Sequence, residues 1–143
     1  MPSVYEIIIT IVALTICTVT DIKKREINPM IPVLLMAAGF LTPNKNYMEN
    51  IICFLIGFAP IFLVNRVGNG GDGDALMCGA MGFSMPLNFG AMVFLITCTL
   101  YVVVLLPAII LTKNKKLQLP YIPFLSFTYI IVLIIHISGG VLA

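Results

Sequence analysis

The sequence predicts an all-α polytopic membrane protein, a bundle of about six transmembrane helices that forms one domain over residues 1–143. Two observations carry this prediction. Sixty per cent of the residues are hydrophobic and only 10% are charged, and the apolar residues fall in long runs separated by short polar turns. Charged residues alone make up roughly a quarter of an ordinary soluble domain. Because each span needs about 20 residues, the chain has room for one helical bundle and for no separate soluble domain.

Six apolar runs give the expected helices in chain order. They cover residues 3–20, 27–41, 51–64, 75–87, 89–111 and 121–137. The first run lacks a preceding basic segment and a small-residue cleavage site, so we expect a first span and not a removable signal. The second and fourth runs are shorter than a perpendicular span. We expect flanking residues to lengthen these two helices, or the helices to stop short inside the bundle.

The basic residues predict the orientation of the bundle. Seven of the eight lie in the connections after the first, third and fifth runs: Lys23, Lys24, Arg25, Arg66, Lys113, Lys115 and Lys116. Consecutive spans alternate in direction, so these connections share one side, which the positive-inside rule assigns to the cytoplasm. We therefore expect a multi-pass protein of the cytoplasmic membrane with both termini outside. The lipid bilayer is an expected partner, and a net charge of +2 is too small to indicate nucleic acid.

Two aspartates are the first functional candidates among the six acidic residues. Asp21 follows the first apolar run and Asp74 precedes the fourth, so both are expected at the cytoplasmic end of the bundle. A carboxylate beside a membrane-spanning segment is energetically unfavourable, and such residues usually perform chemistry or carry ions. We predict that Asp21 and Asp74 meet at one membrane depth and form a shared site.

The residues before the fourth run form a glycine-rich loop. Residues 68–74 read Gly-Asn-Gly-Gly-Asp-Gly-Asp, and the glycines let the backbone adapt and approach a ligand closely. At a helix start the free amides and the dipole favour carboxylates, so one interpretation is that Asp72 and Asp74 only cap the helix. The functional interpretation gives Gly71, Asp72 and Gly73 a role in loop flexibility or substrate positioning beside Asp74.

Two neighbouring carboxyl groups can hydrolyse a peptide bond. They do not both ionise easily, so one retains a proton that the other lacks. The ionised group removes a proton from a bound water, and the protonated group polarises the carbonyl that is cleaved. This chemistry needs no cofactor. A hard cation would want more oxygen ligands than these residues supply, and the four cysteines form no metal-binding pair, so no metal is expected.

Three blocks of the sequence resemble the type 4 prepilin peptidases, membrane aspartyl proteases of the Gly-x-Gly-Asp kind. Residues 21–29 (Asp-Ile-Lys-Lys-Arg-Glu-Ile-Asn-Pro) resemble the family's first block, an aspartate followed by a basic stretch and Ile-Pro-Asn. Residues 71–74 resemble the second block, with Gly82 eight residues after Asp74. Residues 119–124 (Leu-Pro-Tyr-Ile-Pro-Phe) are similar to the Pro-Phe-x-Pro-Phe segment that opens the last span.

The resemblance implies an aspartyl endopeptidase in which Asp21 and Asp74 are the catalytic pair. Its substrates would be prepilin or pseudopilin precursors, from which it would remove a short basic leader at the cytoplasmic membrane face. Asp72 occupies a variable position of the motif and inherits no catalytic role. The tight loop between the first two runs is similar to short members of the family, which lack the cysteine-paired cytoplasmic domain.

Two departures from the family pattern bear on this prediction. Leu76 stands where the family commonly has a lysine, and Asn28-Pro29 reverses the usual Pro-Asn order. Leu76 keeps a non-catalytic assembly factor for pili or secretion as one alternative. The other alternative is a small proton- or cation-coupled membrane transporter, which would place its carboxylates near the bilayer midplane on broken or repeated helices. The sequence contains no evident internal repeat.

Overall fold

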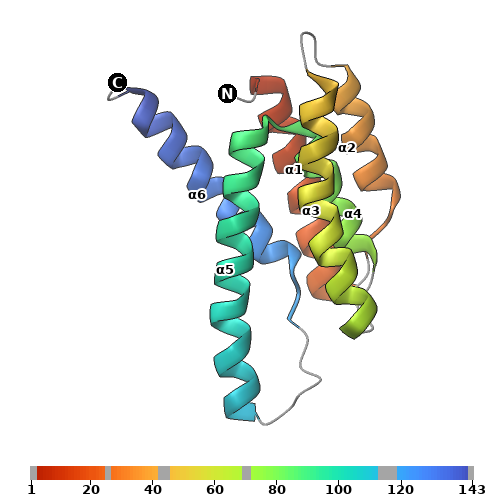
Figure 1. Ribbon diagram of the computed structural model, residues 1–143, viewed down its shortest axis with the longest axis vertical. Coiled ribbons are helices and arrows are strands. Elements are labelled where there is room, and N and C mark those ends of the chain that lie inside the picture. The colour runs from red at the N-terminus through yellow and green to blue at the C-terminus, as the bar shows by residue number, and fades with distance from the viewer. Residues whose placement is uncertain (1–2, 25–26, 42–45, 69–71, 113–118, 142–143) are drawn as a thin grey trace.

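The computed structural model describes residues 3–24, 27–41, 46–68, 72–112 and 119–141, which form six helices and no strands (Figure 1). The predicted all-α class is confirmed, and each helix overlaps one of the six apolar runs. The helices are α1 (Val4–Lys24), α2 (Met30–Phe40), α3 (Tyr47–Gly68), α4 (Asp72–Ser84), α5 (Leu87–Thr112) and α6 (Ile122–Val141).

Side chains near the first three helix starts supply hydrogen bonds that the first helical turns lack. The Ser3 N–H donates to Glu6 Oε2 at 2.6 Å, and the Glu6 N–H donates to Ser3 Oγ at 3.3 Å. This reciprocal pair is a capping box at the start of α1. Asn28 Oδ1 accepts from the Met30 N–H at 3.0 Å where α2 begins, and Asn46 accepts in the same way where α3 begins. Local sequence therefore determines where these helices start.

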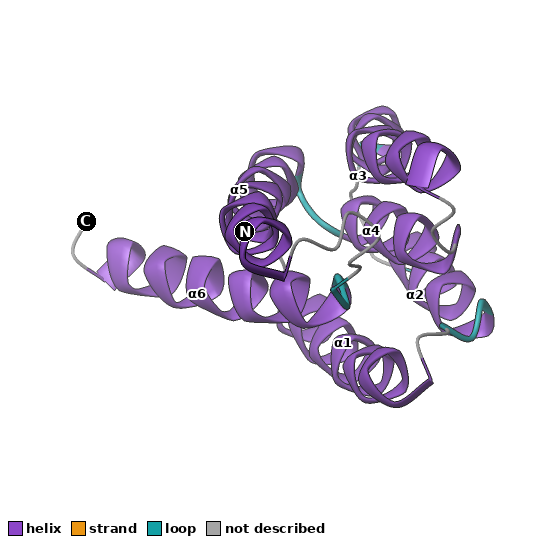
Figure 2. Ribbon diagram, turned by 90° about the horizontal axis from the view of Figure 1, so that it is seen from below, coloured by secondary structure: helices purple, strands orange, loops and turns teal. Residues whose placement is uncertain are grey.

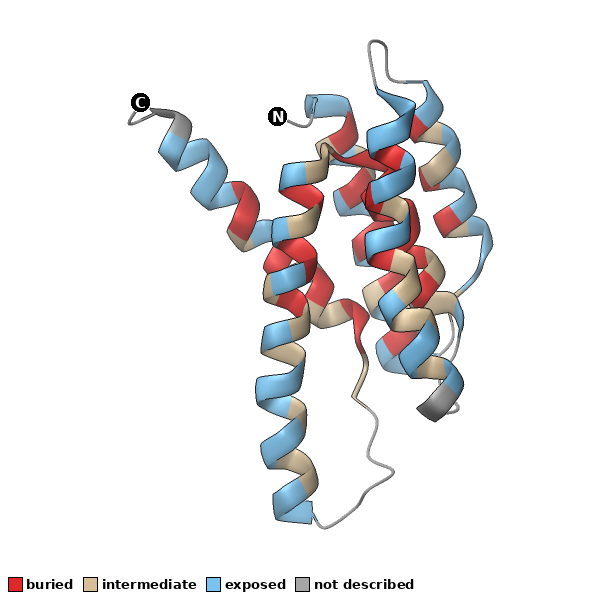
Figure 3. Cartoon of the chain, viewed as in Figure 1, coloured by how far each residue is buried: buried red, intermediate tan, exposed pale blue. Residues whose placement is uncertain are grey.

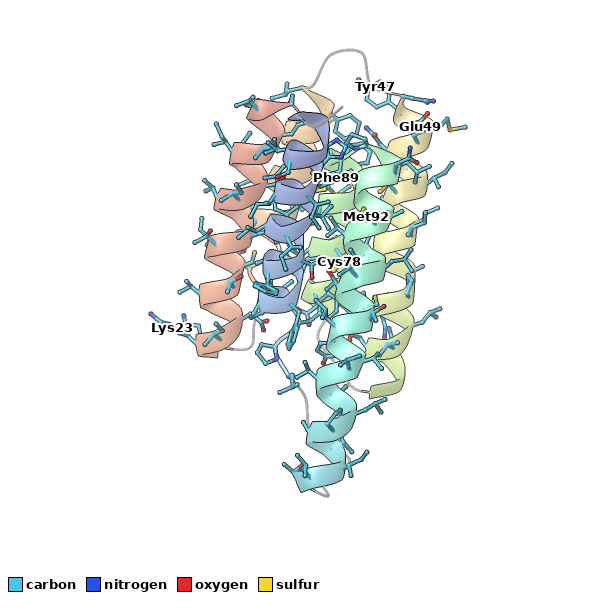
Figure 4. The ribbon with its side chains drawn as sticks, turned by 90° about the vertical axis from the view of Figure 1, so that its left-hand side faces the viewer. Lys23, Tyr47, Glu49, Cys78, Phe89 and Met92 are labelled. Carbon is cyan, nitrogen blue, oxygen red and sulfur yellow. The ribbon has the colours of Figure 1, made fainter. Side chains whose placement is uncertain are left out.

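Consecutive helices alternate in direction, so the bundle has two ends. Helices α1, α3 and α5 run downwards in Figure 1 and end toward its bottom, whereas α1 begins near the top. We call the bottom end the lower end. Figure 4 places Lys23 at the lower end and Tyr47 and Glu49 at the opposite one. Within the bundle, α4 packs against α2 and α3, while α6 packs against α1 and α5 (Figure 2).

Four of the helices that the structure describes, α1, α3, α5 and α6, are long and apolar enough to cross a membrane. In contrast, α2 and α4 have 11 and 13 residues. At 1.5 Å per residue they are about 17 and 20 Å long, which is less than the roughly 30 Å of a bilayer core. Nine of the 13 residues of α4 are buried, so this helix stops short inside the bundle (Figure 3).

Glycines let the backbones of α3 and α4 pack in direct contact. A Cβ added at Gly82 of α4 would lie 2.5 Å from the carbonyl oxygen of Cys53 of α3. A Cβ added at Gly57 of α3 would lie 2.7 Å from the carbonyl oxygen of Cys78 of α4. Small residues at such contacts are typical of helix pairs in membranes, where close packing drives association. Gly82, which the sequence singles out only through a family resemblance, therefore has a packing role.

We predict that Gly82→Ala destabilises the protein, because the added methyl group meets main-chain atoms of α3 that move only if the helices separate. Overpacking of this kind lowers the free energy of unfolding by about 1–3 kcal/mol. Thermal unfolding in detergent should therefore show a lower midpoint for this variant.

Gly139→Ala in α6 is the matched control for this prediction. Nothing lies within 4 Å of the added carbon, and alanine favours a helix over glycine by about 1 kcal/mol. Its unfolding midpoint should equal or exceed that of the wild type. A Gly82→Ala variant as stable as the Gly139→Ala variant would show that the two helices are not in backbone contact.

Candidate active site

Asp21 is a buried carboxylate in the last turn of α1. Its side chain is 5% exposed, and Oδ2 accepts a hydrogen bond from the Ile122 N–H at 3.3 Å. Ile122 is the first residue of α6, and the amides of a first helical turn have no partner within the helix. The carboxylate of one helix therefore caps the start of another, where the helix dipole favours negative charge.

A second contact between α1 and α6 lies one turn from this hydrogen bond. The hydroxyl groups of Thr18 and Ser126 are 2.7 Å apart. Ser126 Oγ donates to the carbonyl oxygen of Ile122 at 3.0 Å, so Thr18 is the donor between the two hydroxyls. This chain of hydrogen bonds fixes the register of α1 on α6 and, with it, the position of Asp21 at the start of α6.

Asp74 lies in the first turn of α4 and is half-buried. The first turn approaches the connection that follows Asp21: a Cβ added at Gly73 would lie 3.0 Å from Cβ of Ile27. Only a glycine fits there without displacing Ile27. Packing therefore requires a glycine at position 73, in addition to its predicted role in the loop. Gly71 lies outside the described residues.

The aspartates come from different helices to the lower end of the bundle. One turn away from each, the Cys17 thiol of α1 contacts the sulfur of Met77 of α4 at 3.8 Å.

Asp74 lies outside the four candidate membrane spans. Burial, and then the negative charge of Asp21, raise the pKa of Asp74 from 3.8 to about 7. The Asp74 carboxyl group therefore keeps its proton up to near-neutral pH.

Two tyrosines line the site beside the aspartates. Tyr121 precedes α6, and its hydroxyl lies 3.7 Å from the thiol of Cys98 on α5. Tyr101 of α5 packs edge-on against Tyr121, with 5.2 Å between the ring centroids. Sequence analysis misses Tyr101 because a single tyrosine within an apolar run gives no signal of its tertiary neighbours.

Asp72 has a partner outside the aspartate pair. Its carboxylate lies 3.8 Å from the guanidinium of Arg66, and both side chains are exposed. The same guanidinium lies over the ring of Phe62, 4.8 Å from the centroid. This contact joins the end of α3 to the start of α4, so Arg66 does more than mark the topology. An exposed ion pair of this kind contributes little to stability.

The cysteines are free thiols and belong mainly to the core. Cys17, Cys53 and Cys78 are buried and Cys98 is half-buried; Figure 4 shows Cys78 inside the bundle. Within the described part of the chain, no group of three or more His, Cys, Asp or Glu side chains is arranged to hold a metal ion.

Comparison with known proteins places this chain in a family. The sequence model of the type IV leader peptidase family matches residues 8–106, which include Asp21 and Asp74 but not residues 119–124. No curated protein and no solved structure gives a significant match. Because the family model covers more than half of the chain, this protein belongs to the type IV leader peptidase family.

Proposed function

We propose that this protein is an aspartyl endopeptidase that removes the leader from prepilin or pseudopilin precursors, with Asp21 and Asp74 as its catalytic pair. Family membership implies a protease. The observation that carries the finer proposal is the unlike placement of the two aspartates: Asp21 accepts the Ile122 N–H at the start of α6, whereas burial, and then the charge of Asp21, raise the pKa of Asp74. Two carboxyl groups in unlike surroundings are what acid–base hydrolysis by a bound water requires.

The surroundings of the two carboxyl groups support different roles. Asp21 accepts the Ile122 N–H at the start of α6, and such a hydrogen bond stabilises the ionised carboxylate. Asp74 keeps its proton because burial and the charge of Asp21 raise its pKa to about 7. We therefore assign Asp21 as the general base and Asp74 as the general acid.

These roles give a balanced hydrolysis. Asp21 removes a proton from a water molecule as the water oxygen attacks the carbonyl carbon, and Asp74 donates its proton to the carbonyl oxygen. The product of this step is a neutral gem-diol, with a proton on Asp21 and a charge on Asp74. The C–N bond then breaks as Asp21 gives its proton to the leaving nitrogen and Asp74 recovers one from a hydroxyl group. Both carboxyl groups return to their starting states.

The substrate in this proposal is an apolar helix that enters from the bilayer, with its basic leader at the lower end of the bundle. Asp72 is an acidic group at this end that attracts the basic leader in this proposal, although the neighbouring Arg66 partly neutralises its charge. Glu26, a second acidic residue that could attract the basic leader, lies outside the described residues. We therefore give Asp72 a role in binding and none in the chemistry.

Asp21→Asn and Asp74→Asn are each expected to abolish leader cleavage, because loss of either acid–base group removes about 100-fold or more of the rate. The measurement is co-expression with candidate prepilins, followed by the mobility and the N-terminal sequence of the product.

Asp72→Asn is the matched control, since it makes the same aspartate-to-asparagine change two residues from Asp74. It should retain turnover at saturating substrate. Cleavage that survives in Asp21→Asn or Asp74→Asn would exclude the proposed pair, and no cleavage by any form would favour the non-catalytic assembly factor.

Cleavage is also expected to fall as the pH rises through about 7, because the reactive pair carries one proton and Asp74 holds it with a pKa of about 7. The apparent value belongs to the pair and not to one residue. The measurement is kcat/KM against pH for the purified protein in detergent, acting on a peptide that contains the leader. A profile that stays flat through neutral pH would contradict the assignment.

The same proton gives a second readout that needs no substrate. Folding raises the pKa of Asp74 from 3.8 to about 7, so the folded protein binds this proton more tightly than the unfolded chain. The resulting stabilisation is complete below the lower value and is lost as the pH rises through the higher one. Asp74→Asn should therefore weaken the decline of the unfolding midpoint over this interval.

We further propose that the lower end faces the cytoplasm, as the basic connections indicate. The measurement is labelling of Lys23→Cys and Glu49→Cys by a maleimide that does not cross membranes; both positions are exposed and lie at opposite ends (Figure 4). In intact cells only Glu49→Cys should react, and Lys23→Cys should react after permeabilisation. The native cysteines give little background because three are buried and Cys98 is half-buried. The reverse pattern would invert the topology.

A further inference from the structure

The segment before α6 depends on side chains for its position. Residues 119–121 precede the helix, and Pro120 has no N–H to donate. A residue before proline also disfavours the helical conformation, so Leu119 does not extend α6 backwards. Its carbonyl oxygen instead accepts a hydrogen bond from the hydroxyl of Tyr101 at 3.1 Å. A side chain of α5 thus holds the main chain just before α6.

The ring of Tyr101 also packs against the last residue before α6 and against the first turn of α6. It meets Tyr121 at 5.2 Å and 66°, and Phe124 at 5.5 Å and 90°, both edge-on. Such edge-to-face contacts are favourable arrangements of aromatic rings. One turn earlier on α5, the Cys98 thiol lies 3.7 Å from the hydroxyl of Tyr121. Helix α5 therefore fixes the start of α6 through the hydroxyl and ring of Tyr101 and through Cys98.

This segment leads directly to the amide that Asp21 accepts. The carbonyl oxygen of Tyr121 accepts the N–H groups of Phe124 and Leu125 at 3.1 and 3.2 Å, so Tyr121 sets where α6 begins. The next residue, Ile122, donates its N–H to Asp21. A displacement of residues 119–121 would therefore move this donor away from the carboxylate.

We propose that Tyr101 is a positioning residue of the candidate active site: it holds residues 119–121 so that the Ile122 N–H stays on the Asp21 carboxylate. Its effect on cleavage rests on the proposed function, whereas its effect on the Ile122 hydrogen bond does not. In this role Tyr101 acts through Ile122.

The first test measures the hydrogen bond itself. Amide hydrogen exchange of Ile122 is followed by NMR in detergent on protein labelled with 15N-isoleucine, with the resonance assigned from an Ile122→Val variant. Tyr101→Phe keeps the ring and removes only the hydroxyl. It should accelerate Ile122 exchange by about three- to tenfold, the factor that corresponds to one hydrogen bond. Asp21→Asn should accelerate the same amide and serves as the reference.

Tyr129→Phe is the matched control, because it removes a tyrosine hydroxyl that lies two turns beyond Ile122 on α6. It should leave Ile122 exchange unchanged. Ile130 and Ile131, further along α6, report whether the whole helix loosens. Unchanged Ile122 exchange in Tyr101→Phe would overturn the proposal, and so would equal acceleration at Ile122, Ile130 and Ile131, since that pattern indicates general unfolding.

The second test measures cleavage of a leader peptide. Tyr101→Phe should lower kcat by about three- to tenfold and leave KM unchanged, because the residue positions the base and does not bind substrate. A raised KM with unchanged kcat would overturn the positioning role. If the wild-type protein cleaves no leader, the proposed function fails, but the exchange measurement still decides whether Tyr101 positions Ile122.

Discussion

The hydrogen bond from the Ile122 amide to Asp21 is the constraint on which the candidate site depends. A carboxylate that is 5% exposed in an apolar bundle needs hydrogen-bond donors, because burial of an unpaired charge is strongly unfavourable. The free amide at the start of α6 also needs an acceptor. Each group satisfies the other, so α1 and α6 are held together at the depth of Asp21. The Thr18–Ser126 contact fixes the same register, and Tyr101 holds the approach to Ile122 from the side of α5.

The other half of the site depends on close packing of the short helix α4. A glycine at position 82 brings α4 against the backbone of α3, and a glycine at position 73 brings its first turn against Ile27. Because α4 is too short to cross a bilayer, these contacts determine how deep Asp74 lies. The half-buried position that results raises the pKa of Asp74. The packing of small and apolar residues around α4 thus controls the protonation of Asp74, which is not one of those residues.

The sequence predicts the fold well because each membrane helix is specified by a continuous run of apolar residues in the sequence. Each apolar run overlaps one helix, since main-chain groups exposed to lipid must be hydrogen-bonded within their own segment. The alternation of the helices also places Asp21 and Asp74 at one end. The hydrogen bond between Asp21 and Ile122 was not predictable, because it joins residues 101 positions apart and involves a main-chain amide. Tyr101 was not predictable for a similar reason: its importance lies in what packs on it.

The surroundings of Asp74 also bear on Leu76, the position where type 4 prepilin peptidases commonly have a lysine. An ammonium group two residues from Asp74 would favour the ionised carboxylate. With leucine there, the influences that set the pKa of Asp74 are burial and the charge of Asp21, and both raise it. A protonated Asp74 is the form that a general acid requires. With leucine at position 76 the site lacks this cation but keeps the groups that the proposed chemistry needs. The absence of the lysine therefore does not by itself argue for a protein without catalytic activity.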